Sequence, residues 1–268
     1  MAESAHLDTR EDIAFESFGV RVRVTADTKE VLEQVPALLP PDAEPCPPST
    51  ADVSLEVFRQ AGGLYEFLID GSQVTQAIDL DFALTLLEAQ LRIHVGLRAP
   101  NRIFVHAGVV AHEGRAIVIP GLSFAGKTTL VLALVEAGAV YYSDEFAVLD
   151  EQGLVHPYAK AVSVRDKDEI QSDHDIQRFG GIAGEEPLEV GAVVFAQYRP
   201  GAEWNPIELS PGRGALSMFG NTLAAMQRSE EAMRVLSLAV EGAVLLEGER
   251  GEASEMAKPL LDRIAQAA

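Results

Sequence analysis

The sequence predicts an α/β protein with a mixed sheet, and three features indicate this fold class. Residues 116–119 are a continuous apolar run rich in β-branched side chains, typical of a strand buried on both faces. Residues 129–137 have the length and pattern of a helix that ends at Gly138. Residues 102–111 form another strand pattern, and the short turn at 112–115 predicts an antiparallel hairpin ahead of the helix.

A glycine-rich segment joins this buried strand to the helix. Residues 121–128 satisfy the pattern G-x-x-x-x-G-K-[ST] of a phosphate-binding P-loop. The order strand, glycine-rich loop, helix is the context that this short motif requires. The residues expected to bind a nucleotide are Gly121, Leu122, Ser123, Phe124, Ala125, Gly126, Lys127, Thr128 and Thr129.

The start of a helix is a natural site for phosphate. Its first backbone N–H groups lack intrahelical partners, and the helix dipole favours negative charge there. Gly121 and Gly126 allow the backbone to approach a phosphate closely. We expect Lys127 to reach the β- and γ-phosphates of ATP and the Thr128 hydroxyl to ligate Mg²⁺.

Asp144 and Glu145 follow an apolar run at residues 139–142. An apolar strand that ends in aspartate is the Walker B pattern, in which the aspartate holds Mg²⁺ directly or through water. Ligands collect at the carboxyl ends of strands in α/β sheets, so Asp144 is well placed for this role. The alternative is an acidic pair that only begins a turn.

Composition argues against several kinds of partner. The 268 residues carry 41 acidic and 21 basic side chains, a formal net charge of −20. Nucleic acids and anionic membranes bind basic patches, so we expect neither as a partner. Cys46 is the only cysteine, residues 1–12 do not resemble a secretory signal, and no apolar run reaches the roughly 18 residues that span a membrane. These features predict a cytoplasmic protein.

The chain divides into two predicted domains. Residues 1–97 are expected to form a small β-rich N-terminal module with helices, and residues 98–268 the P-loop domain. Residues 166–189 are polar and acidic, and we expect either a mobile loop that acts as a lid or recognition segment, or a plain disordered insertion. Other expected elements are a strand at 13–25, helices at 29–39, 79–97, 214–228 and 230–240, and Ser229 as an N-cap.

Residues 102–150 resemble the catalytic domain of the HPr kinase/phosphorylase family and its related P-loop proteins. The matching pieces are His106 with Gly108, the motif at 121–128, Gly138, and the pair Asp144 and Glu145. The resemblance implies a P-loop kinase of the HPr kinase/phosphoenolpyruvate carboxykinase type, in which an antiparallel hairpin precedes the P-loop strand.

The resemblance implies a Mg²⁺-dependent kinase that transfers the γ-phosphoryl group of ATP to a serine-like hydroxyl on a peptide, protein or small molecule. The implied catalytic residues are Asp144, Glu145, His106 and Lys127, and the implied metal ligands are Thr128 and Asp144. Acidic surroundings would raise the pKa of His106; the alternative is a histidine that only fills the core. HPr kinases assemble as rings, so a homo-oligomer is also implied.

Three departures from the family's pattern limit what the resemblance implies. Phe124 stands where the family has glycine, and Glu145 where it usually has aspartate. No copy of the family's Glu-x-Arg-Gly-x-Gly segment or of its arginine-rich loop follows, and Arg165 is the nearest stand-in for those basic groups. We therefore expect an acceptor other than HPr, and the sequence does not identify it.

Two other functions remain open. In a P-loop ATPase or nucleotide-dependent switch, Asp144 and Glu145 would activate water instead of orienting a hydroxyl. In a non-catalytic binding module, the nucleotide would only set the shape of the protein.

Overall fold

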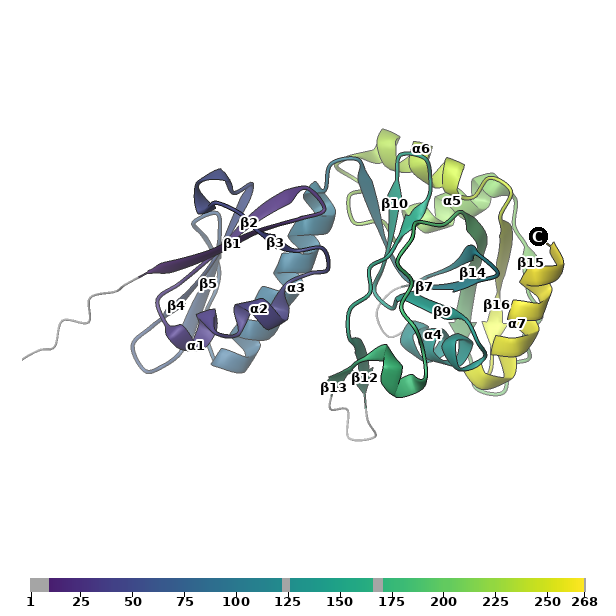
Figure 1. Ribbon diagram of the computed structural model, residues 1–268, viewed down its shortest axis with the longest axis horizontal. Helices are drawn as coiled ribbons and strands as arrows, with labels where there is room; N and C mark the ends of the chain where they lie inside the picture. Colours follow the sequence, from purple (N-terminus) through teal and green to yellow (C-terminus); the bar gives the residue numbers. More distant parts are fainter. Residues whose placement is uncertain (1–9, 122–125, 166–170, 268) are drawn as a thin grey trace, which may run out of the picture. The chain divides into compact units, whose positions relative to one another are not determined.

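The computed structural model describes residues 10–121, 126–165 and 171–267. Over these residues the chain is a mixed α/β protein that separates into two compact units, Met1–Pro100 and Asn101–Ala268 (Figure 1). Each unit is built around a sheet of its own. In the described ranges, no helix is long and apolar enough to cross a membrane.

The first unit contains a six-stranded sheet with the order β3-β1-β2-β4-β5-β6. β2 and β4 are parallel, and the other neighbouring strands are antiparallel. The strands are β1 (Glu11–Ser17), β2 (Val20–Ala26), β3 (Glu44–Pro45), β4 (Val53–Arg59), β5 (Tyr65–Ile69) and β6 (Ser72–Ile78). The helices are α1 (Lys29–Leu32), α2 (Val35–Leu38), the 3₁₀ helix η1 (Pro48–Thr50) and α3 (Leu80–Arg98).

The long helix α3 forms close to its predicted position. Its N-cap is Asp79, whose carboxylate accepts the backbone N–H of Phe82 at 2.8 Å. Its buried face packs against β2, β4 and β5. Burial of each leucine on that face contributes about 1.5–3 kcal/mol. The buried residues are Ala83, Leu87, Leu91, Val95 and Gly96.

Two predictions for this unit are wrong in detail. Residues 13–25 are not one strand, because Phe18 and Gly19 take left-handed conformations and reverse the chain between β1 and β2. Residues 29–39 form α1 and α2 instead of one helix. Pro36 lies in the first turn of α2 and has no N–H with which to continue α1.

The second unit is organised by an eight-stranded mixed sheet with the order β11-β10-β7-β8-β14-β16-β15, in which β9 also pairs with β7. β8, β14 and β16 are parallel, whereas β7 is antiparallel to β8, β9 and β10. The strands are β7 (Arg102–His112), β8 (Arg115–Pro120), β9 (Val140–Ser143), β10 (Phe146–Asp150), β11 (Val155–His156), β14 (Val190–Tyr198), β15 (Ile207–Glu208) and β16 (Val244–Arg250). The predicted antiparallel hairpin is β7–β8.

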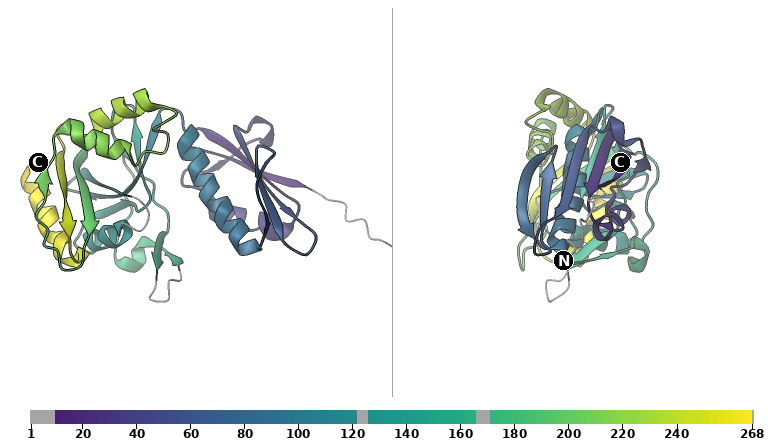
Figure 2. Two further views of the ribbon diagram at one scale, coloured as in Figure 1. Left: turned by 180° about the vertical axis from the view of Figure 1, so that it is seen from behind. Right: turned by 90° about the vertical axis from the view of Figure 1, so that its left-hand side faces the viewer.

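Helices cover both faces of this sheet (Figures 1 and 2). α4 (Lys127–Glu136) and α7 (Ala253–Ala267) pack on one face, and α5 (Pro211–Phe219) and α6 (Ser229–Ala239) on the other. Ile117 and Ile119 of β8 point to the first face and Val118 to the second, which explains the continuous apolar run. β8, the strand before the predicted P-loop, is therefore at the centre of a three-layer core.

Some predicted boundaries in this unit need correction. The helix expected at 214–228 is α5, which ends at Phe219, and α6 begins at Ser229 with Arg228 in the N-cap position. The segment expected to be a mobile loop contains β13 (Gln171–His174), paired with β12 (Val162–Arg165), and the 3₁₀ helix η2 (Ile176–Phe179). Residues 166–170 of that segment lie outside the described ranges.

Candidate functional site

The site begins where β8 ends. Pro120, the last residue of β8, pairs with Ala107 of β7, and the backbone N–H of Gly121 donates to the His106 carbonyl at 3.2 Å. Four of the predicted nucleotide-binding residues, Leu122, Ser123, Phe124 and Ala125, lie outside the described ranges. The chain is described again at Gly126, so the two ends of the predicted P-loop are both fixed by the fold.

Gly126 meets two structural requirements that glycine alone satisfies well. Its φ of 76° is left-handed, a conformation that other residues rarely adopt. A Cβ at this position would lie 2.6 Å from Nη2 of Arg250, a guanidinium nitrogen that donates to the Gly126 carbonyl at 2.9 Å. Arg250 is a site residue that sequence reasoning missed.

The first turn of α4 presents Lys127, Thr128 and Thr129. The first bond of this turn is from Leu130 N–H to the Gly126 carbonyl, at 3.2 Å, so the preceding N–H groups have no intrahelical acceptor. Lys127 is buried, and this burial lowers the pKa of its ammonium group, although the carboxylates of Asp144 and Glu145 oppose the shift. Thr129 is exposed, on a side of the helix that the core does not cover.

Asp144 and Glu145 occupy a break between β9 and β10, both of which run antiparallel to β7. The Ser143 hydroxyl accepts the backbone N–H groups of Glu145 and Phe146 at 3.0 and 2.9 Å and so shapes the break. The Glu145 carbonyl accepts the N–H of Ala107, the residue that pairs with the end of β8. Only β7 therefore separates the carboxylates from the strand that leads into the predicted P-loop.

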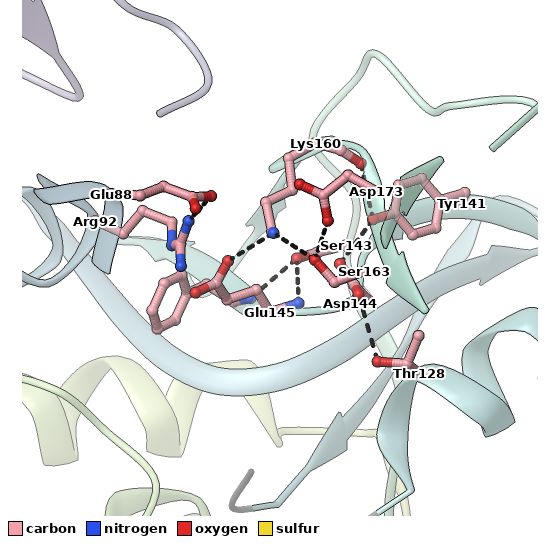
Figure 3. Close-up of polar contacts among 11 residues, drawn as sticks. Glu88, Arg92, Thr128, Tyr141, Ser143, Asp144, Glu145, Lys160, Ser163 and Asp173 are labelled. Carbon is pink, nitrogen blue, oxygen red and sulfur yellow. Dashed lines mark hydrogen bonds and ion pairs between the residues drawn. The ribbon is translucent and has the colours of Figure 1, made fainter. Parts of the chain in front are cut away.

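The Asp144 carboxylate is held between two hydroxyl groups (Figure 3). The Thr128 hydroxyl lies 3.4 Å from its Oδ2, and the Tyr141 hydroxyl donates to its Oδ1 at 3.0 Å. Asp144 is only 7% exposed. Burial raises its pKa above the ordinary value, while the Lys160 ammonium group and the Tyr141 hydrogen bond oppose that shift. A cation close to such an aspartate would stabilise the charged form of its carboxylate.

Glu145 belongs to a second polar group that the β12–β13 hairpin completes (Figure 3). Lys160 Nζ lies 3.4 Å from Glu145 Oε2 and 3.5 Å from the Ser163 hydroxyl. That hydroxyl in turn donates to Asp173, the residue opposite Ser163 in β13. The segment predicted to be a lid or insertion thus contributes one side chain, Asp173, to the surroundings of the carboxylate pair.

His106 is close to these groups, and the structure indicates its charge state. It lies opposite Phe146 in the β7–β10 pairing, and the two rings are 5.8 Å apart. Burial, together with the positive charge of Lys127, lowers the pKa of His106 to about 4. Burial and Lys127, and not acidic surroundings, therefore determine this pKa, and the imidazole is neutral at pH 7.

The structure thus brings Lys127, Thr128, Asp144 and Glu145 together from segments that are separate in sequence. It adds Tyr141, Lys160 and Arg250, which sequence reasoning missed. A signal existed for Arg250, because it ends a parallel strand and ligands gather at such ends. Lys160 lies in no recognisable motif, so no signal in the sequence pointed to it. The backbone of Arg165 ends β12, and its side chain lies outside the described part of the chain.

The donor atoms at Asp144 fit a magnesium ion. Mg²⁺ prefers oxygen ligands and is commonly held by one or two protein oxygens together with phosphates and water. Thr128 Oγ1 and Asp144 Oδ2 are two such oxygens, and they converge to 3.4 Å. Within the described residues, no group of three or more histidine, cysteine, aspartate and glutamate side chains is arranged to hold a metal. A magnesium ion here would complete its shell with phosphate oxygens and water.

Comparisons with known proteins are limited. No protein-family model matches the chain, and no curated protein matches it. A solved structure, the HPr(Ser) kinase/phosphatase from Coxiella burnetii, is similar over 61% of this chain and 96% of that protein, with a TM-score of 0.38 and 14% sequence identity. A likeness this distant assigns neither a family nor an activity.

Proposed function

We propose that the chain is a Mg²⁺-dependent P-loop phosphotransferase that moves the γ-phosphoryl group of ATP to a hydroxyl acceptor. One observation supports this most directly. Lys127 and Thr128 begin α4 at the carboxyl end of β8, and Asp144 reaches within 3.4 Å of the Thr128 hydroxyl from the neighbouring break. A cation, a helix N-terminus and a buried carboxylate converge at this point.

Each group has a role that follows from its chemistry. The backbone N–H groups of residues 123–128 and the Lys127 ammonium would hold the phosphates. Thr128 and Asp144 would hold Mg²⁺, which neutralises charge on the phosphates when bound. His106, neutral at pH 7, would act as a hydrogen-bonding group beside the transferred phosphate and not as a cation.

The transfer step requires a hydroxyl in line with the γ-phosphorus. A bond forms from the hydroxyl oxygen to that phosphorus, the bond to the β,γ-bridging oxygen breaks, and ADP leaves with its electron pair. Glu145 or Asp144 accepts or orients the hydroxyl proton. The Lys160 contact fixes the Glu145 carboxylate, so this acceptor has a defined direction.

The acceptor is proposed only as a class. A serine-like hydroxyl on a peptide, protein or small molecule suits a site whose carboxylates face the γ end of the nucleotide. Self-association and a cytoplasmic location remain predictions from the sequence.

The proposal is tested with γ-labelled ATP, Mg²⁺ and pools of amino acids, peptides and cell extract. We expect label in a stable phosphoester on a hydroxyl compound, and loss of that label in Lys127→Ala. Lys258→Ala is a matched control, because Lys258 is 69% exposed on α7. The nucleotide should also stabilise the wild type, by about 2.7 kcal/mol at a concentration of 100 Kd.

Two results would contradict the proposal. Rapid release of inorganic phosphate without any acceptor, lost in Glu145→Gln, would identify an ATPase. A protein whose stability and spectra do not change with saturating Mg·ATP would not be a nucleotide-binding protein at all.

A further inference from the structure

The sheet has a second group of side chains near the start of α4, on the side away from the carboxylates. The parallel strands β8, β14 and β16 all end at the same edge of the sheet. β7 and the carboxylate break lie on one side of β8, and β14 and β16 lie on the other. The last residues of β14 and β16 are Tyr198 and Arg250.

Arg250 connects this second group to the P-loop helix. Its side chain is 2% exposed, its Nη2 donates to the Gly126 carbonyl at 2.9 Å, and its Nη1 donates to the Gly251 carbonyl at 2.9 Å. Its Nε–H is buried and has no acceptor within the described part of the chain. Burial lowers the pKa of this guanidinium, which nevertheless stays charged. A buried cation with an unpaired donor costs stability, so its presence at this position calls for an explanation.

Tyr198 lies over this guanidinium. The Arg250 Cζ is 5.3 Å from the centre of the Tyr198 ring, and the Tyr198 hydroxyl donates to Glu252 at 3.0 Å. These two contacts hold the ring, yet Tyr198 remains 44% exposed. Its Cβ is 4.0 Å from the position that a Cβ on Gly126 would occupy, so the ring stands next to the start of α4.

The direction of a bound nucleotide follows from the proposed function. Its γ-phosphate lies toward Asp144 and Glu145, and its middle phosphates lie over the N-terminus of α4. The base and ribose must then leave toward the other side of β8, where β14 and β16 end. An aromatic ring held in place and partly exposed at that point is suited to stack on a base.

We propose that Tyr198 stacks on the nucleobase of the bound nucleoside triphosphate, and that Arg250 is the positioning residue that ties this ring to the start of the P-loop helix. The inference rests on the proposed function and extends it to the base end of the same ligand. It assigns a role to the buried guanidinium. It also explains why an exposed tyrosine is held by a cation–π contact and a hydrogen bond.

The test compares ATP with inorganic tripolyphosphate, which has the phosphates but no base. Both are titrated with Mg²⁺ into wild type, Tyr198→Ala, Tyr198→Phe and the control Leu216→Ala, in which an exposed side chain of α5 is shortened. Loss of base stacking should weaken ATP binding by roughly 5- to 100-fold in Tyr198→Ala. Tripolyphosphate binding should be unchanged in both Tyr198 variants. Tyr198→Phe should retain more of the ATP affinity than Tyr198→Ala, because its ring can still stack, and Leu216→Ala should bind both ligands like wild type.

The role of Arg250 is tested by a double-mutant cycle. Arg250→Met should reduce the preference for ATP over tripolyphosphate in the wild-type background but not in the Tyr198→Ala background. Equal weakening of both ligands by Arg250→Met would show a structural role only and would overturn the positioning claim.

The stacking claim has its own contrary result. It is wrong if Tyr198→Ala weakens ATP and tripolyphosphate equally or leaves ATP binding unchanged. Failure of the nucleotide binding on which this inference rests looks different, because the wild type would then bind neither ligand.

Discussion

Two aspartates near the ends of β10 are exposed to solvent to the same small extent, yet their pKa values shift in opposite directions. Asp144, just before β10, and Asp150, its last residue, are each 7% exposed. Burial alone would raise the pKa of Asp150, but hydrogen bonds from His156 and from the Leu154 and Gln152 N–H groups outweigh it, and the pKa is lowered. The pKa of Asp144 is raised, because burial outweighs the groups that favour its charge.

The difference shows how a structural carboxylate is distinguished from a candidate functional one. Asp150 closes the β10–β11 turn and has donors for its charge within the fold. Asp144 carries a charge that the fold itself does not fully stabilise, beside a lysine and a helix N-terminus. A buried carboxylate with a raised pKa in such a place is a reason to expect a ligand.

The largest expected effect on activity comes from substitution of Asp144. Asp144→Asn should lower phosphoryl transfer by roughly 100- to 1,000-fold, because the carboxylate charge that would hold Mg²⁺ is lost. The stability of the protein without nucleotide should stay the same or increase, because a poorly compensated buried charge is removed. Transfer assays and urea unfolding measure both effects.

The control for this variant is Glu151→Gln, which changes an exposed carboxylate just after β10. Transfer at the wild-type rate in Asp144→Asn, or a loss of the same size in Glu151→Gln, would remove the contrast between the two aspartates.

The next effect is the pH dependence of stability that His106 causes. His106 pairs with Phe146, the first residue of β10, close to Asp144 in sequence. Its pKa is about 4 in the folded state and near 6.5 when unfolded, so the unfolded chain binds more protons between these pH values. Its contribution to stability is therefore complete above pH 6.5 and is lost as pH falls toward 4, by at most about 3 kcal/mol.

Urea unfolding between pH 4 and 7 tests this dependence. His106→Gln should show a smaller fall in the free energy of unfolding across that range than wild type. Identical slopes for the two proteins would mean that the imidazole titrates normally in the folded state.

Asp150, whose charge is stabilised by hydrogen bonds within the fold, should contribute to stability and not to phosphoryl transfer. Asp150→Asn should lower the free energy of unfolding by about 2 kcal/mol, because its charge-assisted hydrogen bonds are weakened. Transfer per folded molecule should change little. A large loss of kcat in Asp150→Asn, with the fold intact by circular dichroism, would show that the two aspartates are not functionally different.

The smallest effect is expected from the Tyr141 hydroxyl. Tyr141→Phe removes one donor to Asp144 and should lower kcat/KM by about fivefold, the value of a single hydrogen bond near 1 kcal/mol. Tyr65→Phe is matched, because Tyr65 is also buried and donates to Glu30 in the other unit. Equal kcat/KM in Tyr141→Phe and Tyr65→Phe would show that the Tyr141 hydroxyl does not contribute to the reaction.

The sequence predicted those parts of this account that depend on local pattern. The run around Ile117, the spacing from Lys127 to Asp144 and the short turn before β8 were enough to give the mixed α/β class and the hairpin. The Phe18–Gly19 turn was missed because the apolar alternation continues on both sides of it.

The missing site residues depend on contacts between distant segments. Arg250 lies 124 residues from the Gly126 carbonyl that it contacts, and Tyr198 gains its significance from Arg250. The pKa of His106 depends on burial and on Lys127, which no local pattern encodes. Local pattern thus located the start of α4 and the two carboxylates near it, whereas their electrostatic surroundings required the fold.

The central claim is that Lys127 and Asp144 act on one bound triphosphate chain, the lysine on its phosphates and the aspartate on its magnesium. Calorimetric titration of ATP, with Mg²⁺ and then with EDTA, tests it most directly in wild type, Lys127→Ala and Asp144→Asn. We predict that Mg²⁺ tightens ATP binding to wild type by about tenfold or more, or 1.4 kcal/mol. We predict no such gain in Asp144→Asn and no measurable binding in Lys127→Ala. Equal ATP affinity with and without Mg²⁺, in both wild type and Asp144→Asn, would contradict the account.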